Sequence, residues 1–181
     1  MDRDSKLIIN WRVSKRKRED TFDFIKDLSE RIAGRFQLST DGLAAYAGHR
    51  GVVREIFGQT IDYATEIKVF GKDGISRNQR YNPVKVVAIK RKARLGNPDM
   101  DLATTCHAER TNLSARTFTR RLTRCTIGYS KKLENLRHAI AMFVCHFNFC
   151  RTHSAHKKTP AQAAGLTEKV WTIAELLESA I

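Results

Sequence analysis

The sequence predicts an α/β or α+β domain with a partly parallel sheet. Short β-type patterns alternate with helical patterns through the first half of the chain, and only helical patterns follow. The chain has 181 residues, of which 41% are hydrophobic, so we expect one domain whose core needs neither disulfides nor metal. Lys and Arg number 33 against 19 Asp and Glu, a net charge of +14. This surplus predicts a polyanionic partner, most often nucleic acid, without separating an enzyme from a passive binder.

The first part of the chain alternates strand and helix. Residues 6–13 (KLIINWRV) are apolar and β-prone and predict a strand. Residues 20–33 predict a helix, because apolar side chains recur there every three or four positions and a glycine follows. Residues 35–40 predict a short strand. Residues 43–57 predict a helix that is broken around residues 48–51, where two glycines occur.

The clearest strand pattern covers residues 61–70 (IDYATEIKVF), where apolar and polar side chains alternate. This alternation predicts a half-buried strand with Glu66 on its polar face. Residues 71–82 predict a polar loop. Residues 84–89 predict another short strand, which leads into the basic run at residues 90–94.

The second half of the chain predicts helices. An arginine-rich helix covers residues 107–126, and the next helix begins with Ser130 as its N-cap and carries a buried stripe as far as Phe147. Thr159-Pro160 is a cap followed by a first-turn proline. Residues 172–175 (TIAE) form a capping box that opens a terminal helix.

Two acidic residues are candidate metal ligands. Asp41 directly follows the predicted strand 35–40, where α/β sheets present ligands because the side chain projects beyond the strand. Glu109 begins the arginine-rich helix, and both carboxylates are hard oxygen donors suited to Mg²⁺ or Mn²⁺. Alternatively, Asp41 only starts a turn with Gly42, and Glu109 only favours the helix dipole or pairs with an arginine. The residues alone leave both interpretations open.

The helix of Glu109 also presents a basic surface. Asn112, Arg116 and Arg120 follow Glu109 at spacings of three and four residues, so we expect all four on one helix face. Each arginine fork can donate two hydrogen bonds to one phosphate. A nucleic-acid backbone could therefore lie along this face.

A group of cysteines and histidines resembles a zinc site only superficially. Its spacing contains no paired Cys-x-x-Cys knuckle, so thiols beside polar histidines are the better interpretation. His153 is expected to face phosphate or to serve the structure. The members of this group are Cys145, His146, Cys150, His153 and His156.

Three sequence segments together resemble a known family. They are STDGLAAY (39–46), HAERTNLSARTFTRRLTRCTIGYSKKLEN (107–135), and FNFCRTH (147–153) with the TPA that follows it at 159–161. In this order they are similar to the catalytic core of bacterial DDE-type insertion-sequence transposases, chiefly of the insertion-sequence-one kind. The resemblance covers nearly the whole chain.

The resemblance implies a ribonuclease-H-like mixed sheet flanked by helices, with a helical C-terminal part. The catalytic core would span residues 1–165 and a helical tail residues 166–181. In such transposases three carboxylates hold two Mg²⁺ or Mn²⁺ ions that promote in-line attack on a DNA phosphodiester. Asp41 matches the second Asp of the family and Glu109 its Glu.

The resemblance also implies the partners. They are DNA, as transposon ends and target, and other copies in a homo-oligomer or a mixed assembly with a full-length transposase. The residues expected to contact DNA are Arg110, Asn112, Arg116, Arg120, Arg121, Arg124, Lys131, Lys132, Arg151 and His153.

One departure from the family concerns the beginning of the chain. Residues 1–7 match the second strand of the family, so the first strand and its catalytic Asp have no counterpart here. Asp2 or Asp4 is a poor substitute because both lie at a terminus. We therefore expect an impaired transposase. The alternatives are a non-enzymatic basic DNA-binding remnant, an inhibitor of a full-length transposase, or an RNA- or ribosome-associated protein.

The sequence contains no predicted membrane segment. Its longest apolar stretch, residues 139–144, is far shorter than the roughly 18 residues that a spanning helix needs. The N-terminus, MDRDSKLIIN, does not resemble a signal peptide. We expect a soluble, cytoplasmic protein.

Overall fold

The computed structural model describes residues 1–48, 50–71, 85–123 and 127–179. The chain forms two compact units. The first, Ser14–Thr105, contains the sheet and is called the sheet unit; the second joins Met1–Val13 to Cys106–Ile181 and is called the helical unit. The predicted loop at 71–82 lies outside the described residues except for Gly71.

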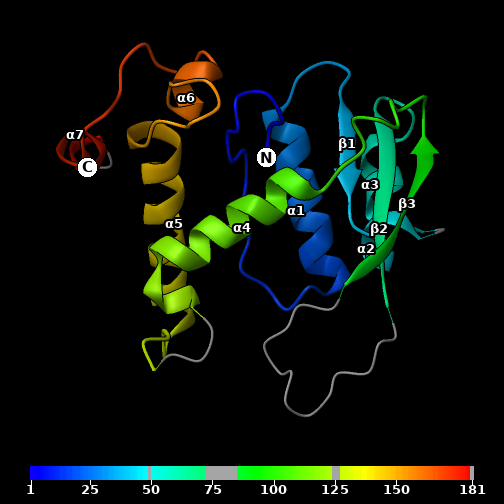
Figure 1. The fold of residues 1–181 in the computed structure, drawn as a ribbon, viewed down its shortest axis with the longest axis horizontal. Helices are drawn as coiled ribbons and strands as arrows, with labels where there is room; N and C mark the ends of the chain where they lie inside the picture. The colour runs from blue at the N-terminus through cyan, green and yellow to red at the C-terminus, as the bar shows by residue number, and fades with distance from the viewer. Residues whose placement is uncertain (49, 72–84, 124–126, 180–181) are drawn as a thin grey trace. The chain divides into compact units, whose positions relative to one another are not determined.

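The sheet unit contains a three-stranded sheet in the order β1-β2-β3 (Figure 1). Its strands are β1 (Gln37–Thr40), β2 (Asp62–Phe70) and β3 (Val86–Leu95). β1 pairs in parallel with β2, and β2 pairs antiparallel with β3. The prediction of an α/β chain with a mixed sheet flanked by helices is confirmed at this coarse level.

Helices α2 and α3 cover one face of this sheet, and α1 packs against α3. Their bounds are α1 Arg18–Arg31, α2 Ala44–Ala47 and α3 Val52–Phe57. The predicted helix at 20–33 and the predicted break near 48–51 are confirmed. Gly51 stands at the break, where a Cβ would lie 2.3 Å from the Tyr46 carbonyl oxygen. The two short helices bury Val52, Val53 and Phe57 in the core.

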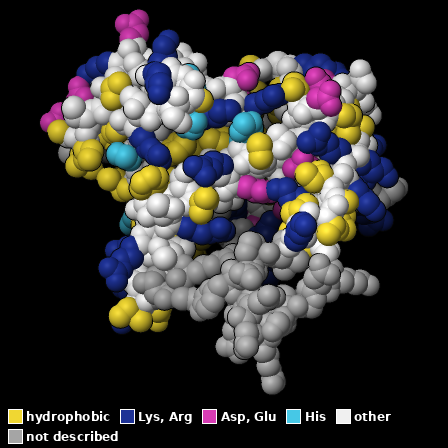
Figure 2. All heavy atoms as spheres, viewed as in Figure 1, with side chains coloured by type: hydrophobic (Ala, Val, Ile, Leu, Met, Phe, Trp, Pro, Cys, Tyr) yellow, Lys and Arg dark blue, Asp and Glu magenta, His cyan; other side chains and the backbone are white. Residues whose placement is uncertain are grey.

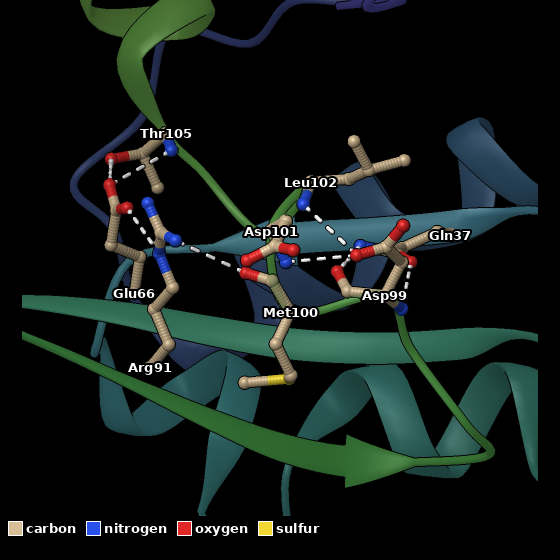
Figure 3. A network of polar contacts seen from close by, with 8 residues as sticks. All are labelled: Gln37, Glu66, Arg91, Asp99, Met100, Asp101, Leu102 and Thr105. Atoms are coloured by element: carbon tan, nitrogen blue, oxygen red, sulfur yellow. Dashed lines mark hydrogen bonds and ion pairs between the residues drawn. The ribbon is translucent and has the colours of Figure 1, made fainter.

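The segment between β3 and Thr105 covers the other face of the sheet (Figure 3). It turns at Gly96, whose φ of +61° suits glycine. Gln37 on β1 exchanges two hydrogen bonds with Asp99: its amide nitrogen donates to the carbonyl oxygen at 2.8 Å, and its amide oxygen accepts from the backbone N–H at 2.7 Å. Both faces of the central strand are therefore covered over Tyr63–Glu66, whereas Ile67 and Phe70 remain exposed.

Glu66 on β2 is buried on this face, its side chain 2% exposed. One carboxylate oxygen accepts from the backbone N–H and the hydroxyl of Thr105, at 3.1 and 3.0 Å. The other accepts from Nε of Arg91 on β3 at 3.2 Å, and Arg91 Nη1 donates onward to the Met100 carbonyl oxygen at 3.2 Å (Figure 3). Burial alone would raise the pKa of Glu66, but the hydrogen bonds from Thr105 and Arg91 outweigh burial and hold it below its usual value.

The structure corrects two predictions for these strands. The alternation in β2 predicted a half-buried strand with Glu66 on a polar face, yet Tyr63, Ala64, Thr65 and Glu66 are all buried. The basic run at 90–94 was expected to follow a short strand. It lies within β3 instead, because its backbone pairs with β2 through residues such as Lys92, opposite Thr65.

The helical unit contains four α-helices, one 3₁₀ turn and one π-helical turn within the described residues. They are α4 (Cys106–Phe118), the 3₁₀ turn η1 (Arg120–Leu122), α5 (Leu133–Cys145), the π-helical turn η2 (His146–Cys150), α6 (Pro160–Ala163) and α7 (Ile173–Glu178). None of the helices in the described part of the chain is long and apolar enough to cross a bilayer.

The ends of these helices can be compared with the capping residues that the sequence predicted. The capping boxes at Thr159 and Thr172 are both present, completed by Gln162 and Glu175. The predicted N-cap at Ser130 is wrong: α5 begins after Lys132, and the Ser130 hydroxyl accepts from Arg121 at 2.9 Å instead. The arginine-rich helix predicted at 107–126 is also shorter than expected, because α4 ends at Phe118 and a 3₁₀ turn follows.

The predicted strand at residues 6–13 is wrong. Its backbone is held by a side chain: Ile8 N–H donates to Asn148 Oδ1 at 3.0 Å, and Asn148 Nδ2 donates to the Ile8 carbonyl at 3.1 Å. Asn148 thus makes the two hydrogen bonds that a neighbouring strand would make. Ile8 packs with Val144 and Phe147 in the core of the helical unit.

Asn148→Ala is expected to destabilise the protein by about 2–4 kcal/mol, because it leaves the buried N–H and carbonyl of Ile8 without partners. Urea unfolding measures the loss. Asn135→Ala, at an exposed position on α5, is the matched control and should change stability little. Equal midpoints for the two variants would show that the contact between Asn148 and Ile8 contributes nothing.

Glu66→Ala is expected to cost about 2–3 kcal/mol near neutral pH, since Arg91 and Thr105 lose a buried charged acceptor. The pKa of Glu66 is lowered on folding, so its contribution is present above its unfolded pKa of about 4.3 and disappears as pH falls through the lower folded pKa. Unfolding curves at pH 7 and pH 3 should therefore differ more between wild type and variant at pH 7. Glu30→Ala, exposed on α1, is the control; a gap that does not narrow at low pH contradicts the assignment.

Candidate nucleic-acid interface and candidate carboxylates

Asp41 lies directly after the last residue of β1, at the end of the parallel strand pair. One carboxylate oxygen accepts from the Leu43 N–H at 3.1 Å, and the other lies 3.4 Å from Arg16 Nη2. The turn needs Gly42, because a Cβ there would lie 2.9 Å from Cγ1 of Ile67. With its side chain 52% exposed, Asp41 both shapes the turn and offers a carboxylate to solvent.

Two tyrosines lie near Asp41 in the sheet unit. The Tyr63 phenol lies 2.7 Å from the Thr40 hydroxyl. Burial raises the pKa of Tyr46 and of Tyr63, and the charge of Asp41 raises both further. Among the described residues, no three His, Cys, Asp or Glu side chains are grouped so as to hold a metal ion. Among the described residues of its own unit, Asp41 therefore offers one carboxylate that could bind a metal ion, and the two nearby tyrosines are neutral phenols.

Glu109 lies in the first turn of α4 and is exposed. Its position suits the positive end of the helix dipole, which is the non-catalytic alternative raised by the sequence. Asp41 belongs to the sheet unit and Glu109 to the helical unit, so neither unit contains both predicted ligands.

The residues expected to contact DNA all belong to the helical unit. No side chain of α4 is buried. Because α4 ends at Phe118, Arg120 lies on η1, so the expected helix face shared by Glu109, Asn112, Arg116 and Arg120 ends at Arg116. Arg124 lies outside the described residues. The exposed members of the set are Arg110, Asn112, Arg116, Arg120, Arg121, Lys131 and Lys132.

Two other members of the predicted set are half-buried. The Arg151 guanidinium carbon lies 4.4 Å from the ring centroid of Phe118 and 5.8 Å from that of Phe147. This cation–π stacking ties the end of α4 to η2. His153 lies in the turn after η2, where its backbone N–H donates to the Lys158 carbonyl at 2.8 Å.

Sequence reasoning missed Lys6 and His107, which meet across the helical unit. The Lys6 ammonium lies 3.5 Å from His107 Nδ1, although the two residues are 101 positions apart in the chain. Lys6 was placed in a predicted strand, and no local pattern links it to α4. The clamp between Ile8 and Asn148 fixes the N-terminal segment and helps to bring Lys6 to this position.

Comparison with known proteins found no match among protein-family models, among curated proteins or among solved structures. The expected relation to DDE-type transposases therefore rests on the sequence segments at 39–46, 107–135, 147–153 and 159–161 alone.

Proposed function

We propose that this chain binds DNA through the exposed arginines of α4 and η1. The single observation that carries the proposal is that these arginines have no carboxylate partners in the part of the chain that the structure describes. Arg110, Arg116 and Arg120 are exposed and make no ion pair with any described residue.

This pattern favours an external anion. A solvent-exposed guanidinium that is not engaged within the protein keeps all its donors for a ligand, and its planar fork matches the oxygens of a phosphate. Lys131 and Lys132, just before α5, add charge to the same unit. Figure 2 shows Lys and Arg side chains distributed over the visible surface with fewer carboxylates among them. Binding of this kind is sequence-independent and salt-dependent.

Arg116→Gln is expected to weaken binding of a duplex and to reduce the slope of log K against log salt concentration by about 0.9 for one lost phosphate contact. Fluorescence anisotropy with a labelled duplex over a range of salt concentrations measures both. Lys26→Gln, exposed on α1 of the sheet unit, removes the same charge and is the matched control. Equal effects of the two substitutions would mean that net charge alone, and not this surface, binds DNA.

A second candidate function is metal-dependent cleavage and joining of DNA strands, as in the DDE transposases that the sequence resembles. It is favoured by the position of Asp41, half-exposed at the carboxyl end of β1. Asp41 and Glu109 have the donor chemistry for Mg²⁺ or Mn²⁺, which would polarise a phosphodiester and activate the attacking oxygen. The non-enzymatic alternative, a DNA-binding protein that interferes with a complete transposase, needs neither carboxylate.

Asp41→Asn and Glu109→Gln separate these two functions. Asparagine keeps the acceptor for the Leu43 N–H, so the turn should persist. If the chain is catalytic, each substitution should abolish Mn²⁺-dependent nicking of supercoiled DNA while duplex affinity changes less than about twofold. Nicking that persists in both variants excludes the DDE assignment, and its absence from the wild type while DNA binding is retained favours the non-enzymatic alternative.

A further inference from the structure

Three cationic or imidazole side chains converge within the helical unit from separate parts of the chain. Lys6 comes from the N-terminal segment, His107 from α4, and His153 from the turn after η2. The Lys6 ammonium lies 3.5 Å from His107 Nδ1, and both Lys6 and His107 act electrostatically on His153. All three are half-buried.

The hydrogen bonds of this cluster leave donors directed to no protein group. The Ala155 N–H donates to His153 Nδ1 at 3.2 Å, which places the proton of the neutral ring on Nε2. The Lys6 ammonium donates to His107 Nδ1, so that ring also carries its proton on Nε2. Neither Nε2 has a hydrogen-bond partner among the described residues. Lys6 donates to the Arg3 carbonyl and to His107, which engages two of its three N–H groups.

The charged groups around His153 are mainly cationic. Burial lowers the pKa of His153, and the neighbouring His156, Lys6, Arg151 and His107 lower it further. Asp2 accepts from the backbone N–H of Ser5 at 2.8 Å and also from its hydroxyl. Asp4 is exposed, and its charge only partly offsets burial, Lys6 and Arg3, which together lower the pKa of His107. An ammonium group beside two imidazole N–H donors is a combination that suits an anion such as phosphate.

Neighbouring contacts build the arrangement. His156 Nε2 donates to the Ser5 carbonyl at 3.0 Å while its Nδ1 accepts from the Lys158 N–H at 3.3 Å, so His156 has no donor left and acts as a positioning residue. The rings of His153 and His156 lie 5.3 Å apart. Lys6 has a φ of +62°, an uncommon conformation for a non-glycine residue that the surrounding contacts hold.

We propose that Lys6, His107 and His153 form a binding site for one phosphate group, with a phosphate of the DNA backbone as its ligand. The DNA ligand rests on the proposed function, whereas the phosphate site does not. The two imidazole Nε2–H groups and the remaining ammonium N–H are the donors. This site would hold DNA at a point that the exposed arginines of α4 do not supply.

The test uses the full chain, with inorganic phosphate and a DNA duplex as separate probes. Nitrogen-15 NMR of the histidine rings should show the Nε2 signals of His107 and His153 shifting when either probe is added. Lys6→Met and His153→Gln should each weaken duplex binding by about tenfold at low salt, equivalent to about 1.4 kcal/mol. The control is His138→Gln, on an exposed position of α5, which should change affinity less than twofold.

The outcomes separate this site from the proposed function. Shifts with inorganic phosphate in a chain that does not bind DNA would support the site and reject DNA as its ligand. DNA binding that depends on Arg116 but is unchanged in Lys6→Met and His153→Gln, with no phosphate-induced shift, would overturn the site and leave the proposed function intact. Circular dichroism and thermal melting identify a variant that fails to fold; His107→Gln then replaces it.

Discussion

The burial of one carboxylate, that of Glu66, governs how the sheet unit is assembled. A charged group that leaves water must be paired and hydrogen-bonded, because an unsatisfied buried charge costs more than most other contacts contribute. Glu66 is on the central strand, so its partners must come from a neighbour in the sheet and from a segment that crosses the sheet face. Arg91 on β3 and Thr105 meet these requirements. Thr105 is also the last residue of the unit, so the same interaction fixes where the chain leaves the sheet.

In the helical unit, too, buried polar groups must find hydrogen-bond partners. The N-terminal segment carries backbone N–H and carbonyl groups into a core of Ile8, Val144 and Phe147, where no strand is available to pair with them. Asn148 provides one acceptor and one donor from a single side chain. This clamp makes the N-terminal segment part of the helical unit. It thereby carries Lys6 to His107, so the proposed phosphate site depends on a contact whose own role is structural.

The features that the sequence predicted are those encoded by neighbouring residues. The capping boxes at Thr159 and Thr172 depend on side chains three positions apart, and the break before Gly51 depends on local crowding. The errors concern partners that are distant in the chain. Residues 6–13 have the composition of a strand, but their backbone partner is Asn148, 140 positions away from Ile8. Alternation in β2 likewise could not reveal that Thr105 and Arg91 would bury Glu66.

For the candidate sites too, local features could be predicted from the sequence and contacts between distant residues could not. The exposure of the α4 arginines follows from a local excess of charge that no apolar stripe could bury, so composition was sufficient to predict it. The position of Asp41 after β1 followed from a local strand signal. The contact between Lys6 and His107 depends on how the N-terminal segment packs, which no periodicity encodes.

The ion pairs indicate where the positive charge of the chain, +14 in total, is least neutralised by carboxylates. The arginine–carboxylate pairs made by arginines 16, 18, 31, 35 and 91 all lie in the sheet unit. Those guanidiniums are partly neutralised by neighbours and hold the fold together. The arginines of α4 and η1 have no such partners among the described residues, so their potential is not cancelled locally. The proposed binding of an anion is therefore expected where arginine serves no structural carboxylate, and the proposed binding of DNA does not depend on whether Asp41 supports catalysis.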